Sequence, residues 1–233
     1  MQLFYITNIN GQLATLEAEE ARHLQVLRKK IGDQINLVDG KGSFHLAELL
    51  ELSKKKAQLK ILSSELQTPA LFSLHIAIAP TKNIARLEWF LEKATEIGIQ
   101  EITPIYCEHS ERKRIRLDRL EKIVLSAMKQ SNRAYLPQLN EETTFKQFIA
   151  AQKENSSLKY IAHCEEEEKV ELYNNYEARK DVLVLIGPEG DFSSNEIELA
   201  READFVGVSL GKARLRTETA GIVACHTIQL LNQ

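Results

Sequence analysis

Two short apolar runs, each followed by a glycine-containing loop, constrain this chain more than any other feature. The first run, residues 182–186, ends at Gly187-Pro188-Glu189-Gly190, and the second, residues 205–210, ends at Gly211. A polar stretch with helical character separates them. Apolar runs of this length are typical of strands buried on both faces of a parallel sheet. In such a sheet the loops that follow the strands lie side by side at the carboxyl edge, where ligands bind.

Both loops have the residue types of a small-molecule site. Their glycines lack a Cβ, so backbone groups can approach a ligand closely. Pro188 stiffens the first loop because its ring fixes φ. In the second loop Arg214 and Arg216 alternate with Leu215, which makes one face cationic. An ordinary turn with solvated arginines would explain either loop alone, but the two loops in this order favour a binding site.

The rest of the chain indicates two domains. Residues 1–70 are rich in strand patterns, and a turn signal at residues 39–42 separates two of them. Thr68-Pro69 marks the boundary. Strand patterns at residues 74–79, 99–106 and 159–162 then alternate with helical patterns, of which the first covers residues 83–97 before Gly98. This alternation predicts an α/β domain with a largely parallel sheet over residues 71–233.

The two loops resemble a known family signature. IGPEG at residues 186–190, LG at 210–211 and LRTETA at 215–220 closely resemble the RsmE family, SPOUT-class methyltransferases that modify N3 of a uridine in small-subunit ribosomal RNA. Similar blocks at residues 23–28, 89–98 and 130–133 extend the likeness over nearly the whole chain. There are two departures: Asp191 stands where a glycine is expected, and residues 212–214 replace a Pro-Arg-Ile type of run.

The resemblance implies a fold, a reaction and an assembly. The expected fold is a SPOUT methyltransferase domain with a C-terminal trefoil knot, preceded at residues 1–70 by a small PUA-like β-barrel domain that binds RNA. The expected reaction is methyl transfer from S-adenosylmethionine to N3 of a uridine in the decoding region of 16S rRNA, on the small ribosomal subunit. The expected state is a cytoplasmic homodimer that does not bind a membrane.

The resemblance also implies roles for individual residues. Backbone amides and apolar side chains of the two loops would hold the cofactor: Ile186, Gly187, Pro188, Glu189, Gly190, Leu210, Gly211, Leu215, Thr217 and Ala220. Catalysis would involve Arg216, Glu218 or Thr219, which would position the base or its anionic form. A cation beside the developing imide anion would lower the barrier. Which group accepts the N3 proton is left open by the sequence.

Three clusters are candidates for RNA contact. They are Arg22, His23, Arg28 and Lys29; Arg112, Lys113, Arg114 and Arg116; and Gln130 with Arg133. Cations of this kind suit phosphate binding. A solvated helix end or a helix cap would explain the same residues. Because the formal net charge is −3, RNA binding must depend on such local patches.

Composition narrows the remaining choices. The chain has 233 residues, 43% of them hydrophobic, which fits a globular protein with one large or two small domains. No apolar run approaches the roughly 20 residues of a membrane span. Three widely spaced cysteines fit reduced thiols, and the six histidines show no metal-ligand spacing. Two rival functions stay open: a SPOUT methyltransferase acting on a ribose hydroxyl or on transfer RNA, and a non-catalytic RNA-binding or ribosome-assembly factor.

Overall fold

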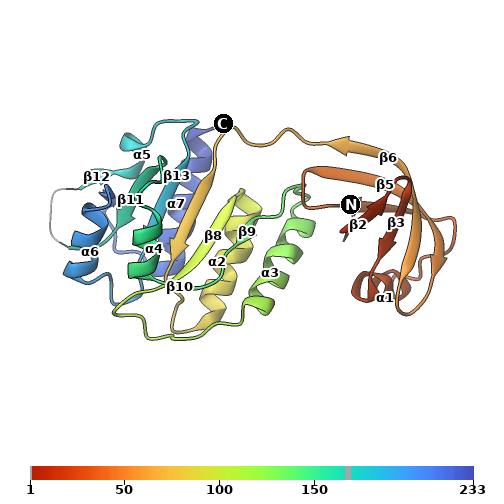
Figure 1. Cartoon of the computed structure of the whole chain (residues 1–233), viewed down its shortest axis with the longest axis horizontal. Helices are drawn as coiled ribbons and strands as arrows, with labels where there is room; N and C mark the ends of the chain where they lie inside the picture. The colour runs from red at the N-terminus through yellow and green to blue at the C-terminus, as the bar shows by residue number, and fades with distance from the viewer. Residues whose placement is uncertain (1, 166–168) are drawn as a thin grey trace. The chain divides into compact units, whose positions relative to one another are not determined.

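The computed structural model describes residues 2–165 and 169–233, which form two units (Figure 1). The first unit consists of Met1–Pro69 and Leu125–Leu136, and the second of Ala70–Val124 and Pro137–Gln233. The segment Leu125–Leu136 lies inside the range that the sequence assigns to the second domain. Helix α3 (Leu117–Gln130) therefore contributes residues to both units.

The first unit is a six-stranded sheet with one helix. Its strand order is β1-β4-β5-β6-β3-β2, in which β1 and β4 are parallel and the other pairs antiparallel. Because β1, β3, β4, β5 and β6 all contribute to one apolar cluster, the sheet must curve around it. Helix α1 adds Ala21 and Leu24 to this core. The elements are β1 (Leu3–Tyr5), β2 (Asn8–Asn10), β3 (Leu13–Leu16), α1 (Ala18–Val26), β4 (Gln34–Val38), β5 (Ser43–Leu52) and β6 (Ala57–Leu66).

The segment Leu125–Leu136 joins the first unit through apolar packing and polar contacts. Met128 is buried in a cluster with Leu3 and Val38. Lys129 Nζ lies 2.5 Å from Glu20 Oε1. The Tyr135 ring passes so close to Gly42 that a Cβ there would lie 2.5 Å from it, and φ at Gly42 is +112°. Only glycine satisfies both conditions.

The second unit is built on a parallel sheet. Its order is β10-β8-β7-β13-β11-β14-β12, with β9 paired to β8, and every pair recorded among the described residues is parallel. The predicted strands at residues 74–79, 99–106 and 182–186 are confirmed. The strands are β7 (Leu74–Ile78), β8 (Glu101–Tyr106), β9 (Gln138–Leu139), β10 (Thr143–Thr144), β11 (Leu158–Ala162), β12 (Val170–Glu171), β13 (Val182–Ile186) and β14 (Val206–Ser209).

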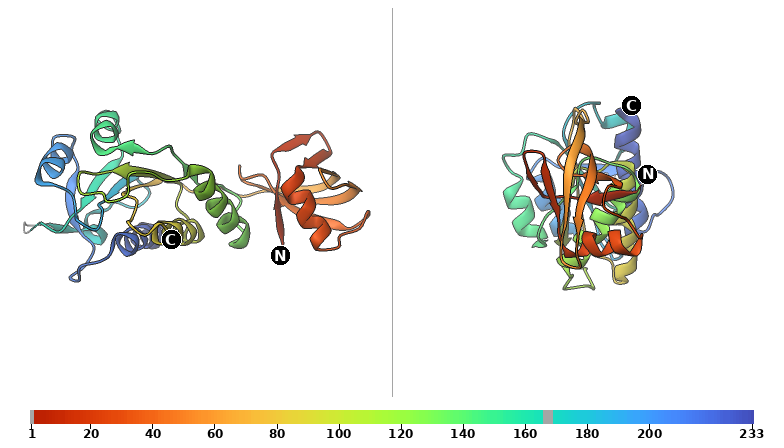
Figure 2. Two further views of the ribbon diagram at one scale, coloured as in Figure 1. Left: turned by 90° about the horizontal axis from the view of Figure 1, so that it is seen from below. Right: turned by 90° about the vertical axis from the view of Figure 1, so that its right-hand side faces the viewer.

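Helices cover both faces of this sheet (Figure 2). Helices α2 (Ile84–Ile97) and α7 (Thr217–Leu231) pack together on one face. Their close approach depends on Gly221, because a Cβ at that position would lie only 2.6 Å from the Phe90 ring. Helices α4 (Phe145–Ala151) and α6 (Ser194–Arg201) lie on the other face over Leu183 and Leu185. The short helix α5 (Leu172–Asn175) follows β12.

Local signals set the ends of these helices. The Asn83 side chain accepts the Ala85 N–H at 3.2 Å, and Gly98 ends α2 with φ +120°, as the sequence predicted. Ser193 begins α6 with a capping box that includes Glu196.

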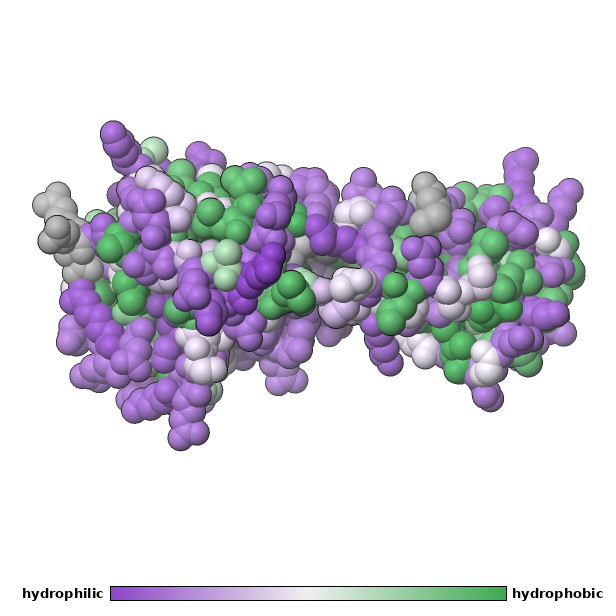
Figure 3. Space-filling model, turned by 90° about the horizontal axis from the view of Figure 1, so that it is seen from above, coloured by the Kyte–Doolittle hydropathy of each residue, from purple (hydrophilic) through white to green (hydrophobic). Residues whose placement is uncertain are grey.

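Hydrophobic and hydrophilic side chains are interspersed on the face seen in Figure 3. No helix of the described residues has the length and apolarity needed to cross a membrane.

Candidate functional site

A cleft of about 710 Å³ opens at the carboxyl edge of the parallel sheet. It lies among the loops that follow β11, β13 and β14, together with the first turn of α7. Of the residues predicted to hold the cofactor, all except Gly190 line it. The lining residues are Ala162, His163, Cys164, Lys169, Ile186, Gly187, Pro188, Glu189, Asp191, Val208, Ser209, Leu210, Gly211, Lys212, Ala213, Arg214, Leu215, Arg216, Thr217 and Ala220.

The loop after β13 is held by hydrogen bonds from three other segments. The Lys82 N–H, after β7, donates to Glu189 Oε1 at 3.0 Å. The hydroxyl of Thr217, at the start of α7, donates to the Gly187 carbonyl at 3.0 Å. His109 Nδ1, after β8, lies 3.1 Å from the carbonyl oxygens of both Gly190 and Asp191. Because carbonyl oxygens only accept, Nδ1 must carry the proton. These bonds make the loop a fixed wall of the cleft.

The glycines of this loop allow close packing from behind. A Cβ at Gly187 would lie 3.0 Å from the Phe192 ring, which is itself buried in the core. A Cβ at Gly190 would lie 3.0 Å from the Cβ of His109. Gly190 is thus packed against the loop after β8, which explains its absence from the lining. Neither position has room for a larger side chain without movement of its neighbours.

The second predicted loop follows β14 and leads into α7. Gly211 has φ +118°, which favours glycine, and no atom lies within 4 Å of its Cβ position. Its N–H donates to Ser209 Oγ at 3.1 Å. Residues 211–214 are exposed, whereas Leu215 is half-buried. The loop therefore presents Arg214 and Arg216 to the cleft and directs one apolar side chain inward.

A third wall of the cleft is formed by described residues after β11, namely His163, Cys164 and Lys169, which were not among the predicted site residues. Lys169 Nζ donates to the carbonyl oxygens of His163 at 2.8 Å and Glu165 at 2.6 Å. The Cys164 N–H donates to Asp191 Oδ2 at 2.7 Å. Burial, with the Asp191 carboxylate nearby, raises the pKa of the Cys164 thiol. Nothing in this stretch carries a glycine signal, so only the register of β11 beside β13 reveals it.

The residues predicted to be catalytic are placed differently from one another. Arg216 immediately precedes α7, is exposed and lines the cleft. Glu218 is buried in the first turn of α7, and its Oε1 lies 3.7 Å from Nε of Arg86 on α2. Thr219 is half-buried, and neither Glu218 nor Thr219 lines the cleft. Arg216 is therefore the member of this set that faces the cleft directly.

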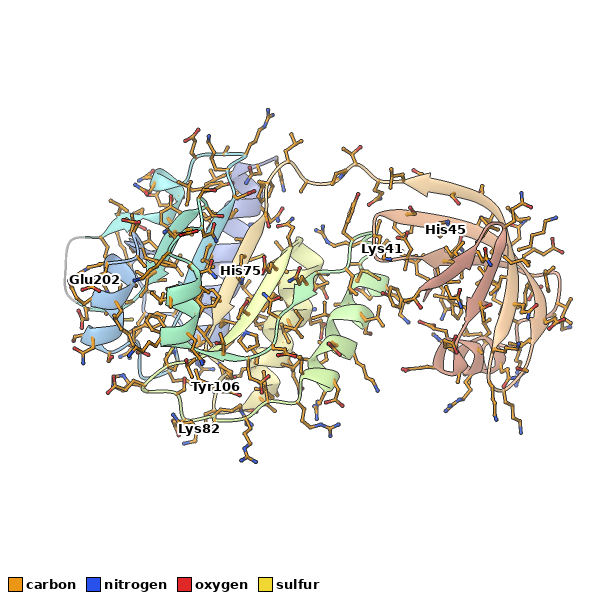
Figure 4. The ribbon with its side chains drawn as sticks, viewed as in Figure 1. Lys41, His45, His75, Lys82, Tyr106 and Glu202 are labelled. Carbon is orange, nitrogen blue, oxygen red and sulfur yellow. The ribbon has the colours of Figure 1, made fainter. Side chains whose placement is uncertain are left out.

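The basic loop after β8 contains cations of two kinds. Arg112 is half-buried, and its Nε and Nη2 donate to the carbonyls of Thr81 at 2.9 Å and Lys82 at 2.6 Å. Arg116 pairs with Asp118 at 2.8 Å. Lys113 and Arg114 are exposed. In Figure 4, Lys82 and Tyr106 lie at this edge of the sheet. Arg112 thus braces the loops, whereas Lys113 and Arg114 are available to an anionic partner.

The predicted RNA contacts in the first unit are also mixed. Arg22 and Arg28 are exposed, and Arg28 has φ +55° directly after α1. His23 packs against Phe4 with ring centroids 5.2 Å apart. The remaining predicted contacts are Lys29 and Arg133, which are half-buried, and Gln130, which is exposed at the end of α3. Within the described residues, no group of three or more His, Cys, Asp or Glu side chains is placed to hold a metal ion.

Comparisons with known proteins agree with this geometry. The family model described as an RNA methyltransferase domain matches residues 68–229, and one described as an RNA methyltransferase PUA domain matches residues 16–62. The fold and the cleft therefore define an α/β RNA methyltransferase with an N-terminal PUA-like domain.

Similarity to individual proteins identifies the family within this class. The chain is 29% identical to ribosomal RNA small subunit methyltransferase E of Rickettsia conorii, over 97% of this chain and 94% of the relative. A crystal structure of a probable rRNA-methyltransferase from Porphyromonas gingivalis is 43% identical, with a TM-score of 0.90, over 100% of this chain and 98% of that chain. A crystal structure of a ribosomal RNA small subunit methyltransferase E from Neisseria gonorrhoeae, bound to S-adenosyl methionine, is 30% identical, with a TM-score of 0.85. The match covers 100% of this chain and 98% of that chain. The chain belongs to the RsmE family of ribosomal RNA small subunit methyltransferases.

Proposed function

We propose that this protein transfers the methyl group of S-adenosylmethionine to N3 of a uridine in the decoding region of 16S rRNA, on the small ribosomal subunit. One observation carries the proposal: the loops that hold the family signature meet around a single cleft at the carboxyl edge of the parallel sheet. The Neisseria gonorrhoeae relative with S-adenosyl methionine bound supports the choice of cofactor.

The cleft fits a nucleoside cofactor. Its volume of about 710 Å³ is within the usual range for small-molecule sites. Pro188 and Leu215 would flank the adenine, and backbone groups around Gly187 and Gly211 would form hydrogen bonds with the cofactor. S-adenosylmethionine supplies a methyl group that its sulfonium makes reactive. The task of this chain is to orient the reactants and exclude water.

We assign Arg216 to the part of the site that contacts the target uracil. Its guanidinium is always charged and stands at the cleft without a side-chain cap to the helix that follows. A cation there would stabilise the imide anion that forms as N3 loses its proton. We place Glu218 and Thr219 behind it. The Glu218 carboxylate, next to Arg86, would fix the first turn of α7 and hence the direction of Arg216.

The RNA would be held by separate surfaces on the two units. In the second unit, exposed Lys113 and Arg114 would contact phosphates while Arg112 keeps their loop in place. In the PUA-like unit, Arg22 and Arg28 have the exposure that phosphate contacts require. The remaining contacts would come from His23, Lys29, Arg116, Gln130 and Arg133. The target uridine must be unpaired or extruded because base pairing hides N3.

The proposal also covers assembly and chain topology. Membership of the RsmE family implies a SPOUT domain at residues 71–233 with a C-terminal trefoil knot. Trp89 on α2 is 44% exposed and Leu230 on α7 is 54% exposed, and such apolar side chains suit packing against a second copy in a homodimer. A PUA-like domain at residues 1–70 and a cytoplasmic location complete the proposal.

A labelled-methyl assay tests the reaction. Purified protein is incubated with tritiated S-adenosylmethionine and small ribosomal subunits that lack the modification, and the labelled nucleoside is identified after digestion. Label on N3 of uridine is the expected result. Label on a ribose oxygen, or transfer to transfer RNA instead, would move the enzyme to another SPOUT activity. Cofactor binding without transfer would favour an RNA-binding or assembly role.

A further inference from the structure

Asp191 has a backbone conformation that L side chains rarely adopt. Its φ is +65°, in the left-handed region that glycine enters without a steric penalty. The similarity to the RsmE family predicts a glycine at this position, and the backbone shows why: the loop after β13 turns through a glycine-like conformation here. This chain nevertheless keeps the conformation with a charged side chain. Because a residue with a Cβ disfavours this conformation, interactions elsewhere in the structure must stabilise it.

The Asp191 carboxylate forms a bridge between two walls of the cleft. Its Oδ2 accepts the Cys164 N–H at 2.7 Å, and its Oδ1 accepts the Phe192 N–H at 2.9 Å. Asp191 belongs to the loop after β13 and Cys164 to the loop after β11, and both residues line the cleft. Each carboxylate oxygen therefore satisfies a backbone donor in a different segment. Bonds of this kind, from an N–H to an ionised acceptor, are stronger than bonds between neutral groups.

A glycine here would leave the two loops less restricted. The Cys164 N–H would lose its carboxylate partner, and the left-handed turn would become one of several accessible conformations. A ligand that contacts both loops would then have to order them as it binds. Interactions that fix a site before binding raise affinity because this ordering has already occurred.

We propose that Asp191 is a positioning residue that preorganises the cofactor cleft by tying the loop after β11 to the loop after β13. The proposal rests on the proposed binding of S-adenosylmethionine in this cleft. In place of the flexibility of a glycine, this chain uses a side-chain bridge that sets the distance between the two walls. Asp191 acts through the loops and is not itself assigned a step in methyl transfer.

The chain contains a matched control. Asp204 also has φ +65°, but it lies in the turn after α6, is exposed and does not line the cleft. Its Oδ2 is 3.7 Å from Lys159 Nζ. Replacing either aspartate by glycine relieves the same backbone restriction. Only the replacement at position 191 breaks a bridge between cleft walls.

The test compares Asp191→Gly, Asp191→Asn, Asp204→Gly and the wild-type protein. Calorimetric titration measures the Kd for S-adenosylmethionine, thermal unfolding of the ligand-free proteins measures stability, and hydrogen exchange follows the peptide that contains Cys164. Asp191→Gly should raise Kd roughly tenfold, which is a change of ~1.4 kcal/mol. It should also speed exchange of the Cys164 amide while leaving Tm near the wild-type value.

Asparagine also tolerates the left-handed conformation and retains one acceptor oxygen. The Kd of Asp191→Asn should therefore fall between those of the wild type and the glycine variant. Asp204→Gly should leave both Kd and Cys164 exchange unchanged. A wild-type Kd for Asp191→Gly would overturn the inference, as would equal Kd changes for both glycine variants. Failure of the wild-type protein itself to bind S-adenosylmethionine would instead contradict the proposed function.

Discussion

The two edges of the parallel sheet differ in what their polar side chains leave between them. At the carboxyl edge, side chains such as Glu189 and Arg112 bind backbone groups of neighbouring loops, and a cleft remains between those loops. At the amino edge, side chains such as Asp181 also bind loop backbone, here the Ser73 N–H at 2.7 Å, but a buried network of side chains bound to one another fills the space. His75 Nε2 lies 2.7 Å from Thr103 Oγ1, and Asn140 Nδ2 donates to that hydroxyl and to Glu101 Oε1, both at 2.7 Å.

This contrast separates a binding site from a structural network. Fully paired polar groups that fill space make a rigid core but present nothing to a ligand. Polar groups that hold loop backbones leave other backbone donors and acceptors facing a cleft. Changes at the carboxyl edge should therefore alter binding and turnover, and changes at the amino edge should alter stability alone.

The largest expected effect on cofactor binding comes from Gly187→Val. The new Cβ would lie 3.0 Å from the buried Phe192 ring, and the added methyl groups would force the loop after β13 into the cleft. Affinity for S-adenosylmethionine should fall by roughly 100-fold, or about 2.7 kcal/mol. Calorimetric titration measures the loss. Gly11→Val, in an exposed turn of the first unit with φ +61°, is the control: it introduces backbone strain but should leave binding intact. Normal affinity in the Gly187 variant would place the cofactor elsewhere.

Arg216→Ala should affect turnover instead of binding. Loss of a cation that stabilises a developing anion typically lowers kcat by ~100-fold or more. Because the side chain is exposed at the mouth of the cleft, Kd for the cofactor should change by less than about threefold, under ~0.7 kcal/mol. Single-turnover methylation of small subunits and calorimetry give the two quantities. Arg216→Lys should recover part of the rate because it restores the charge. An unchanged rate in the alanine variant would remove Arg216 from the mechanism.

A smaller effect is expected from the double variant Lys113→Ala and Arg114→Ala. Both side chains are exposed on the basic loop after β8. If each contacts a phosphate, the slope of log affinity against log salt should become shallower by ~0.7 to 0.9 per residue. Binding of 16S rRNA fragments at several salt concentrations measures this slope. The pair Lys146→Ala and Lys153→Ala removes the same charge from other exposed positions and should leave the slope unchanged. Equal slopes in both double variants would contradict an RNA contact at the loop.

Much of this architecture could be predicted from the sequence because its signals are local. Asn83 and Gly98 mark the ends of α2, and the apolar run of β13 is buried throughout. The two glycine loops lie at one edge because parallel strands place their exits together. These features depend on neighbouring residues and on the general geometry of sheets.

Other parts of the site depend on contacts that a local pattern does not encode. Cys164 and Lys169 line the cleft because β11 pairs with β13, and no loop signal accompanies them. Gly190 is packed against His109, which is 81 residues away in sequence. The Glu218 carboxylate on α7 lies beside Arg86 of α2, so it is directed toward that helix and away from the cleft. Which side of a loop or helix faces the ligand is decided by such tertiary partners.

The smallest effect is expected at the amino edge. Burial lowers the pKa of His75, and the nearby Glu101 carboxylate opposes this only in part. Because the folded-state pKa lies below the unfolded value of 6.5, the folded protein favours neutral His75. Stability from this group is therefore complete above pH 6.5 and declines as the pH falls toward the folded-state pKa. Each kcal/mol lost should lower Tm by about 2–4 °C.

His75→Gln isolates this contribution. Glutamine retains a polar partner for Thr103 but does not titrate, so Tm should fall less steeply between pH 7 and pH 5 than in the wild type. His226→Gln, at an exposed position of α7, should keep the wild-type pH dependence. Affinity of the His75 variant for S-adenosylmethionine at pH 7 should equal that of the wild type, because no residue of the amino-edge network lines the cleft. A clear loss of affinity would show that the two edges are coupled through β7, and the division of roles between them would then be wrong.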